Sequence, residues 1–372
     1  MNVPARAPHP CLAEGLAPEV HHRLRVLHVE GRALYASRGL ELHRSTDGGA
    51  TFQFVARAPG DLLERRLART SLVARVLRAG FHGLTPLPSG DLVATVRGGL
   101  LHLAAGEARF RWAHLLRRGK RPLSVCRHPS GRLYFGEYFS NPRREEVHIY
   151  GSEDGRSWEV TASFPAGAIR HVHGIVHDPY REGMWVLTGD EDEECGLWWT
   201  DDEFSSIEPV LRGDQRARAV TVLPLTSGLV VPMDTPQEEN FVQHLDPQSG
   251  RLERLADLPG SAFHAARTRD LWLISTAVEA SAVNTDDRPA LFASRDGHDW
   301  RCVARFHRDL PRLARTRSLF QWPTLVLPTG ESELPTVFAS GQSLLGAHDR
   351  CLAWNEGDLL DVLPLPAPRL CA

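Results

Sequence analysis

Residues 45–52 read STDGGATF, and this stretch decides the fold because related stretches recur along the chain. Residues 152–158 read SEDGRSW, residues 294–300 read SRDGHDW, and residues 200–204, TDDEF, form a degenerate copy. In such a turn, Ser and Asp side chains bond to nearby backbone N–H groups, Gly takes a positive φ and an aromatic ring packs beneath the hairpin. Each copy follows a short apolar run. We therefore predict a strand–turn–strand unit at each copy.

The spacing of the copies predicts a repeat of about fifty residues. They begin at positions 45, 152, 200 and 294, and a unit of about 48–54 residues fits the gaps as two, one and two units. A second landmark agrees with this count: polar turns precede short β-rich runs at Gly31, Gly90, Gly131, Gly183, Gly228, Asp270 and Gly330. Seven units of four strands, A to D, predict an all-β, seven-bladed β-propeller. A β-helix or a β-sandwich would not produce this period.

These turns resemble the Asp-box, or BNR repeat, of sialidase-like β-propellers. The resemblance implies a single seven-bladed propeller over residues 21–372, preceded by an N-terminal extension at residues 1–20. It also implies that a ligand binds over the central channel, on the face opposite the Asp-boxes. Residues 60–80, GDLLERRLARTSLVARVLRAG, combine helix formers with five arginines, which is typical of a helical insertion or of a solvated basic face.

Composition excludes several other classes of function. Of the 372 residues, 42% are hydrophobic and 24% are charged, as in an ordinary globular protein. The net charge of −3 provides no basic field for nucleic acid. We expect no membrane span, because no stretch approaches ~18 apolar residues, and no signal peptide is visible. Six cysteines without a C-x-x-C pair indicate reduced thiols. We therefore expect a cytoplasmic monomer that binds neither nucleic acid nor membrane.

Counting from the turn glycines predicts a collar of polar residues at one end of the channel. Seven residues after five of these glycines, near the ends of B strands, lie Arg38, Arg97, Tyr138, Asp190 and Thr235. At the starts of A strands lie Arg23, His82, Arg121, His171, His173 and Arg218. Ligand sites usually hold a few such convergent polar groups. We therefore predict a carbohydrate site at this end.

The centre of the predicted site is the fourth unit. Residues 170–174, RHVHG, begin its A strand, and residues 188–194, TGDEDEE, end its B strand. This places His171 and His173 near Asp190, with Tyr138 as the remaining catalytic candidate. The substrate-binding candidates are Arg97, Arg170, His82, Glu137, Arg218 and Asp234.

The first of three readings is a lyase that acts on an acidic sugar. Arg97 or Arg170 would neutralise a carboxylate, while His171 or His173 acts as the base and Tyr138 as the acid. Some polysaccharide lyases are propellers with His, Tyr and Arg in such roles, and bacterial surface polysaccharide is one setting for such chemistry.

The second reading is a glycoside hydrolase and the third is a binding platform without catalysis. Sialidases use three arginines, a Tyr–Glu pair and a separate Asp, but this sequence has no R-I-P motif near its start. Glu137 and Tyr138 are adjacent, and adjacent strand residues face opposite ways. A hydrolase would instead need Asp190 with Glu137 or Asp234. The fold itself does not decide between catalysis and binding.

We expect that the protein needs no cofactor. The alternative is a divalent metal held by His171, His173 and Asp190, because H-x-H on a strand with a nearby carboxylate matches the ligand preferences of transition ions.

Overall fold

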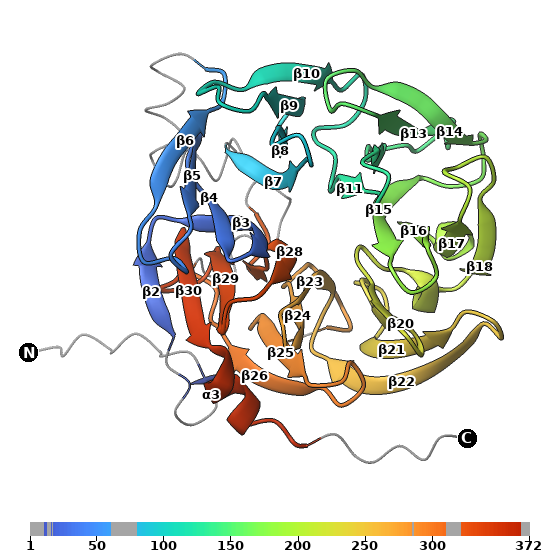
Figure 1. The fold of residues 1–372 in the computed structure, drawn as a ribbon. Helices are drawn as coiled ribbons and strands as arrows, with labels where there is room; N and C mark the ends of the chain where they lie inside the picture. The colour runs from blue at the N-terminus through green and yellow to red at the C-terminus, as the bar shows by residue number, and fades with distance from the viewer. Residues whose placement is uncertain are drawn as a thin grey trace, which may run out of the picture.

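The chain forms antiparallel β-sheets that stand around a central channel, as in a β-propeller (Figure 1). The computed structural model describes residues 11–12, 16, 18–60, 80–284, 286–309 and 321–365. The sheets follow one another around the ring in chain order (Figure 1). Residues 61–79, which make up nearly all of the predicted helical insertion, lie outside the described residues.

Five of the sheets have four strands each. Four of these sheets consist of consecutive strands: β7 (Phe81–Pro86), β8 (Leu92–Val96), β9 (Gly99–Leu103) and β10 (Arg111–Leu115); β11 (Cys126–Arg127), β12 (Leu133–Gly136), β13 (Val147–Ser152) and β14 (Glu159–Phe164); β15 (His171–Asp178), β16 (Gly183–Gly189), β17 (Gly196–Thr200) and β18 (Glu208–Arg212); and β19 (Leu223–Leu225), β20 (Gly228–Pro232), β21 (Asn240–Asp246) and β22 (Arg251–Leu258). The fifth sheet combines both ends of the chain: β27 (Thr324–Val326), β29 (Thr336–Gln342), β30 (Arg350–Asn355) and β2 (Glu19–His22).

The remaining strands form one ten-stranded sheet. In order, they are β1 (Cys11–Leu12), β26 (Arg301–Arg305), β25 (Ala290–Ser294), β24 (Trp272–Thr276), β23 (Ala262–Arg267), β28 (Thr329–Ser332), β3 (Arg25–Gly31), β4 (Ala33–Arg38), β5 (Glu41–Ser45) and β6 (Gln53–Arg57). The prediction of seven four-stranded blades therefore needs correction. Five four-stranded sheets are separate, and the groups predicted as the first and sixth blades share one sheet. The cause is β28, which pairs in parallel with both β3 and β23.

The inner strands are buried on both faces because neighbouring sheets pack against each other. All residues of β8 and β16 are buried, whereas the outer strands β10 and β18 are exposed or half-buried. Trp185 of β16 packs with Leu229 of the next sheet, and Met184 packs with Ile149 of the preceding one. Removal of apolar surface from water stabilises this packing by about 25 cal/mol per Å². The packing explains why inner strands read as apolar runs without alternation.

The repeated turns have the hydrogen bonds that their local chemistry predicts. Ser152 Oγ accepts from Gly155 N at 2.8 Å, and Asp154 Oδ1 accepts from Arg156 N and Ser157 N at 2.8 and 3.0 Å. In the turns at residues 45 and 294, the serine Oγ likewise accepts from a glycine N at 2.9 Å, from Gly49 and from Gly297. Each turn connects the third strand of its group to the fourth.

These turns also contact the preceding sheet. Gly155 has φ +72°, and a Cβ added there would lie 2.4 Å from Val93 Cγ2 in β8. A Cβ added at Gly297 would lie 2.9 Å from Leu225 in β19. Glycine is therefore needed at Gly155 both for its backbone conformation and for the close approach of two sheets.

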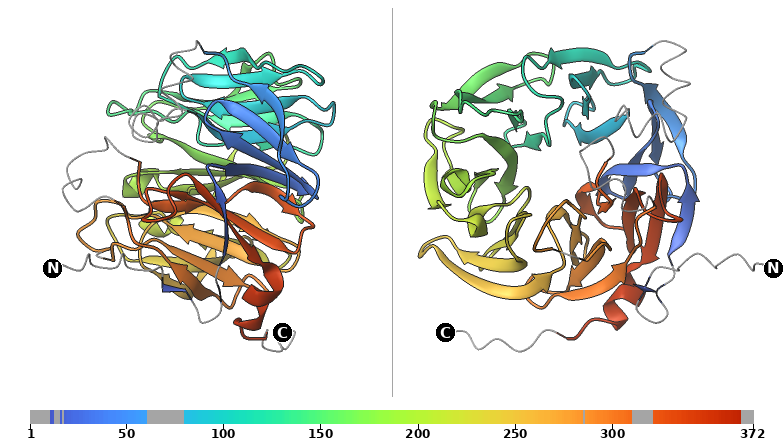
Figure 2. Two further views of the ribbon diagram at one scale, coloured as in Figure 1. Left: turned by 90° about the vertical axis from the view of Figure 1, so that its left-hand side faces the viewer. Right: turned by 180° about the vertical axis from the view of Figure 1, so that it is seen from behind.

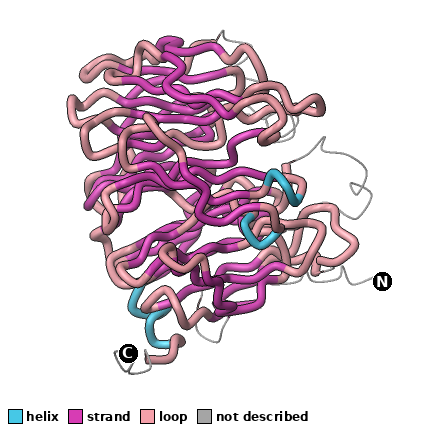
Figure 3. The backbone as a smooth tube through the Cα atoms, turned by 90° about the vertical axis from the view of Figure 1, so that its right-hand side faces the viewer, coloured by secondary structure: helices cyan, strands magenta, loops and turns pink. Residues whose placement is uncertain are grey.

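The ring closes where the two ends of the chain pair with each other. β2 pairs antiparallel with β30, so that Val20 lies opposite Leu352. Figure 2 shows this contact from behind, with the N-terminal strands beside the C-terminal ones. Helical structure in the described part of the chain is limited to η1 (Asp192–Glu194), η2 (Gln215–Ala217) and α3 (Glu356–Asp361) (Figure 3). None of the described helices is long and apolar enough to cross a bilayer.

Candidate functional site

The central channel holds a cavity of about 1790 Å³ that is lined by residues from every sheet of the ring. Within the β15–β18 sheet, His171 pairs with Gly189 at one end, whereas Thr200, which begins the repeated turn, pairs with Met184 near the other end. The starts of A strands and the ends of B strands therefore meet at the end of the channel away from the repeated turns. Loops held there by a rigid scaffold are well placed to bind a ligand.

His171 and His173 begin β15, and a β-bulge brings their rings together. His173 is the extra residue, because Val172 pairs with Thr188 and Gly174 pairs with Leu187. Such a bulge re-aims a side chain relative to a regular strand. Gly189 leaves room for the ring, since a Cβ there would lie 2.8 Å from His173 Cε1. As a result, the Nε2 atoms of His171 and His173 lie 3.0 Å apart.

Backbone carbonyls fix the tautomers of both rings. His171 Nδ1 lies 3.0 Å from the Phe139 carbonyl oxygen, and His173 Nδ1 lies 3.1 Å from that of Ala219. Because a carbonyl oxygen can only accept, each Nδ1 carries a proton and donates it. In neutral rings both Nε2 atoms then present lone pairs to each other. A cation, either a proton or a metal ion, is needed between them.

Asp190 follows β16 and adds a carboxylate to this cluster. Its Oδ1 lies 3.5 Å from His171 Nε2 and 3.3 Å from His173 Nε2. The guanidinium of Arg218 is 3.1 Å from Oδ1, and that of Arg170 is 3.2 Å from Oδ2. Burial raises the pKa of Asp190, but hydrogen bonds from the two histidines and the charges around it lower this pKa well below its usual range. Asp190 is therefore ionised at neutral pH.

The three ligand atoms of His171, His173 and Asp190 all lie within 4.8 Å of one another. Burial lowers the pKa of His173, and the hydrogen bond to Asp190 offsets only part of this effect. A neutral imidazole held by its Nδ1–H is the form that ligates metals. The cluster thus offers two nitrogens and one oxygen to a divalent cation.

Tyr138 lies against this cluster from the neighbouring sheet. Its ring centroid is 4.3 Å from that of His171 and 6.0 Å from that of His173. A backbone hydrogen bond of 2.9 Å from Val172 N to Glu137 O ties the end of β12 to the start of β15. Burial, followed by the negative charge of Asp190, raises the pKa of Tyr138 to about 12. The phenol therefore keeps its proton at neutral pH and can donate it.

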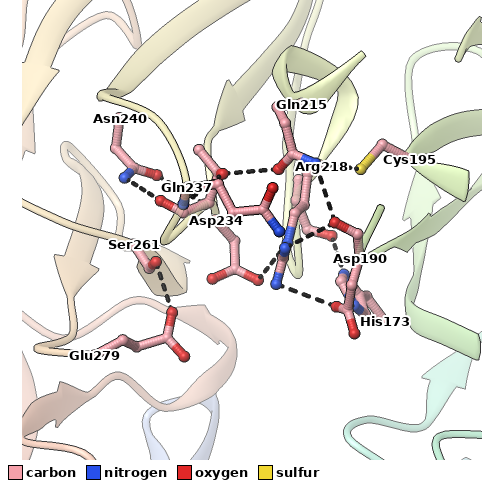
Figure 4. Close-up of polar contacts among 12 residues, drawn as sticks. His173, Asp190, Cys195, Gln215, Arg218, Asp234, Gln237, Asn240, Ser261 and Glu279 are labelled. Atoms are coloured by element: carbon pink, nitrogen blue, oxygen red, sulfur yellow. Dashed lines mark hydrogen bonds and ion pairs between the residues drawn. The ribbon is translucent and has the colours of Figure 1, made fainter. Parts of the chain in front are cut away.

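Arg218 connects Asp190 to a second acidic region (Figure 4). Its Nε lies 3.8 Å from Asp234 Oδ2, while its Nη2 contacts Asp190. Asp234 is 4% exposed, and its Oδ1 is buried without a hydrogen-bond partner. Ser261 Oγ donates to Glu279 Oε2 at 2.7 Å. Asp234 and Glu279 both line the cavity.

A cationic wall lines another part of the same cavity. Its charge comes from Arg25 and Arg121, and His264 lines the cavity with them. Burial, followed by the charge of Arg121, lowers the pKa of Arg25 to about 10. Burial, followed by the charges of both arginines, lowers the pKa of His264 to about 3. The site therefore combines acidic groups, positive charge and a phenol in one cavity, which suits an anionic polar ligand.

The structure brings most of the predicted site residues together. The cavity is lined by His82, Tyr138, Arg170, His171, His173, Asp190, Arg218 and Asp234. Two of the predicted residues do not line this cavity. Arg97 is exposed in the tight turn between β8 and β9 and does not line the cavity. Glu137 is buried on the opposite side of its strand from Tyr138, where it forms an ion pair with Arg118 and accepts from His148 N at 2.9 Å.

Sequence reasoning missed Glu279, His264 and Arg25. Asp190 was predicted by counting seven residues from the turn glycine of its unit. The sixth unit has Asp270 in place of that glycine, so no such count could be made there. Glu279 nevertheless follows the end of β24, as Asp190 follows β16, and His264 lies in the first strand of its group, as His173 does. Arg25 begins β3, and the expected residue, Arg23, is exposed.

No family model matches this sequence, and a search of curated proteins finds no similar sequence. Solved structures do share the fold. An oligogalacturonate lyase in complex with manganese is 10% identical with a TM-score of 0.56, and the match covers 91% of this chain and 96% of that one. A chain of the mitotic checkpoint complex is 12% identical with a TM-score of 0.53, and covers 95% of each.

A puromycin hydrolase mutant complexed with PGG is 14% identical with a TM-score of 0.50. The match covers 86% of this chain but 58% of the hydrolase, so this chain spans little more than half of that protein. At these identities the likenesses show a propeller fold, and this fold is shared by enzymes and by a component of a regulatory assembly. The function must be argued from the site.

Proposed function

We propose that this protein is a carbohydrate-active propeller that binds an acidic glycan at the channel mouth and cleaves it by β-elimination. The observation that carries the proposal is the convergence of Tyr138, Asp190 and the two histidines with Arg170 in one cavity. An elimination needs a positive charge beside the sugar carboxylate, a base for the adjacent C–H and an acid for the leaving oxygen.

We propose that His171, His173 and Asp190 hold a divalent cation. Atoms about 2.0–2.2 Å from one metal ion lie about 3 Å apart, and the separations here are 3.0, 3.3 and 3.5 Å. The backbone carbonyls that hold both Nδ1 atoms are partners of the kind that orient metal-binding histidines. When bound, such a cation would neutralise a sugar carboxylate and acidify the neighbouring C–H. The lyase of the same fold that contains manganese supports this proposal.

The remaining groups have roles that follow from their contacts. Arg170 lines the cavity beside the cluster, where its guanidinium pairs with Asp190 at 3.2 Å, so it is placed to bind a substrate carboxylate as well. Tyr138 holds the proton that the leaving oxygen needs. If Nε2 of His171 and His173 ligates a cation, neither ring can serve as the base, and this role falls to another group.

Glycoside hydrolysis is the second candidate, and one observation favours it. Arg218 lies between Asp190, whose pKa is held low, and Asp234, whose pKa burial and the charge of Glu279 raise well above its usual value. Two carboxyl groups with opposite shifts are the pattern of a base and an acid. A sialidase-like Tyr–Glu pair is not favoured, because Glu137 faces away from Tyr138. Kinship with BNR propellers rests on the repeated turns and stays a prediction.

Incubation with a panel of acidic and neutral oligosaccharides, with and without Mn²⁺, tests the function. Mass spectrometry should find fragments with an unsaturated end, whose masses sum to that of the substrate. Fragments that gain one water would show a hydrolase instead, and binding without any product would leave a binding platform.

Two variants connect any product to this site. His173→Ala should abolish Mn²⁺ binding measured by calorimetry, and Tyr138→Phe should retain Mn²⁺ binding but lower turnover about 100-fold. Arg97→Ala is the matched control, because Arg97 lies outside the cavity. Unchanged Mn²⁺ binding and turnover in folded His173→Ala and Tyr138→Phe would contradict the proposal.

A further inference from the structure

A pair of carboxyl groups lies in the same cavity but outside the metal cluster. Asp234 follows β20, and Glu279 follows β24 of the next sheet. Asp234 N donates to Arg218 O at 3.0 Å, and Met233 O accepts from Ala262 N at 2.9 Å, so backbone bonds join the two sheets beside the pair. Figure 4 shows both carboxyl groups on the same side of Arg218.

Glu279 is positioned by the scaffold rather than by a counter-ion. Ala277 N donates to Ser261 O at 2.8 Å, and Val278 N donates to Pro323 O at 3.0 Å, which fixes the segment that carries Glu279. Ser261 Oγ then bonds to Oε2 at 2.7 Å. Oε1 is the oxygen that remains to meet a ligand in the cavity.

Asp234 has fewer partners than an ionised buried carboxylate needs. Its Oδ1 is buried without a hydrogen bond, and the nearest guanidinium nitrogen, Arg218 Nε, is 3.8 Å from Oδ2. That guanidinium is already paired with Asp190 at 3.1 Å. Leaving a buried charge in this state is costly, so protonation of Asp234 is the favourable outcome.

The surroundings of the pair raise the pKa of both carboxyl groups. Burial and the charge of Glu279 raise the pKa of Asp234, and Arg218 and a hydrogen bond from Ser261 oppose this only in part. Burial also raises the pKa of Glu279, against the effects of Ser261 and Arg218. Asp190 adds further negative charge, and Tyr138 is neutral. A glutamate with a raised pKa is a stronger base than an ordinary carboxylate, which suits it to accept a proton from carbon.

We propose that Glu279 is the general base of this site and that Asp234 is a neutral acid that donates a hydrogen bond beside it. This assignment rests on the proposed elimination and supplies the base that the metal cluster cannot. Glu279 Oε1 takes the proton from the carbon next to the sugar carboxylate, and that electron pair forms the C=C bond. The bond to the leaving oxygen breaks, and Tyr138 protonates that oxygen. Solvent then removes the proton from Glu279 and restores that of Tyr138.

A titration of the side-chain carboxyls tests the pair without any substrate. In protein labelled with ¹³C at these carbons, NMR should find one carboxyl that titrates well above the usual value of about 4 and a second that is also raised. Glu279→Gln should remove one of them and move the other toward its ordinary value, because the neighbouring charge is gone. Asp234→Asn should remove the other. Glu253→Gln, on the exposed outer strand β22, is the control and should leave the signals of both cavity carboxyls in place. Ordinary titration of all carboxyls in wild type would overturn the pair.

Turnover and metal binding then separate this inference from the proposed function. Glu279→Gln should bind Mn²⁺ as wild type does but lose about 100-fold or more in kcat for elimination. Full turnover in this variant would overturn the role of Glu279 while leaving the lyase intact. Absence of any elimination by wild type would overturn both, and the NMR titration would still show whether the two carboxyls share the environment described here.

Discussion

Asp190 is the residue on which the site depends most, because four groups rely on its charge. Arg170 and Arg218 approach its two oxygens, and both histidines face Oδ1. Its side chain is 21% exposed, so solvent screens these contacts only in part. A carboxylate with this role contributes to folding as well as to binding, which makes its effect on stability measurable.

Asp190→Asn should destabilise the protein by about 3 kcal/mol at pH 7, because two guanidinium groups lose a buried counter-charge. The pKa of Asp190 is lowered in the fold, so its contribution is present above the unfolded pKa of about 4 and declines as pH falls below it. Urea unfolding in the presence of a chelator should therefore show the difference between wild type and variant shrinking from pH 7 to pH 3. Asp201→Asn, at an exposed turn position, is the control. A difference independent of pH would contradict this explanation.

At the level of the element, the repeated turns act as joints between sheets. Their hydrogen bonds are local, but the glycine of each turn lies against a side chain of the preceding sheet. A substitution at such a glycine should affect the packing of two sheets. Comparison of two glycines separates this packing effect from the backbone strain at positive φ. Gly155 and Gly131 both have positive φ, but only Gly155 is crowded by a neighbour.

Gly131→Ala should cost about 1 kcal/mol, because alanine is strained at positive φ. Gly155→Ala should cost about 2 kcal/mol more, because its Cβ would overlap Val93. Free energies of unfolding from urea titrations measure both. Restoration of part of the loss by the double variant Gly155→Ala with Val93→Ala would confirm that the contact between sheets is the cause, whereas equal losses at the two glycines would contradict it.

Local chemistry was predictable from the sequence, and distant pairing was not. The Ser and Asp bonds of the turns follow from residues within a few positions of one another, and the strand ends that carry Asp190 and Tyr138 followed from counting. β28 could not be predicted, because its parallel partners lie about 60 and 300 residues away and its sequence, TGES, has no β-forming pattern. Glu279 was missed because Asp270 stands in place of the glycine from which the count began.

At the level of the whole molecule, closure depends on the pairing of β2 with β30. The last sheet of the ring is completed by an outer strand that comes from the other end of the chain, and this pairing joins the two ends. The four residues of β2 therefore influence every sheet, although they contact only one directly.

A chain that lacks residues 1–23 should unfold about 5–10 °C lower and aggregate more readily, because β30 loses β2 and β26 loses β1, which leaves both as open edges. Addition in trans of a peptide of residues 16–24 should restore much of the loss. The same peptide with Val20→Pro should not, because proline cannot donate to the ladder. Differential scanning calorimetry with each peptide measures the effect, and equal rescue by both peptides would contradict pairing as the cause.

β28 has a mechanical consequence for this ring. Its parallel pairing fastens β3 to β23, the two groups on either side of the sheet in which the chain ends meet. The region where the chain ends meet is thus held by two sets of backbone pairing, that of β2 with β30 and that of β28 with β3 and β23. The separate sheets elsewhere are held together mainly by side-chain contacts. When the ring is strained, neighbouring sheets that lack backbone pairing should separate first, and the region where the two chain ends meet should stay closed. Tyr138, the two histidines, Asp190 and Asp234 lie on such separate sheets, where small movements can admit a bulky ligand, whereas Glu279 lies on the ten-stranded sheet.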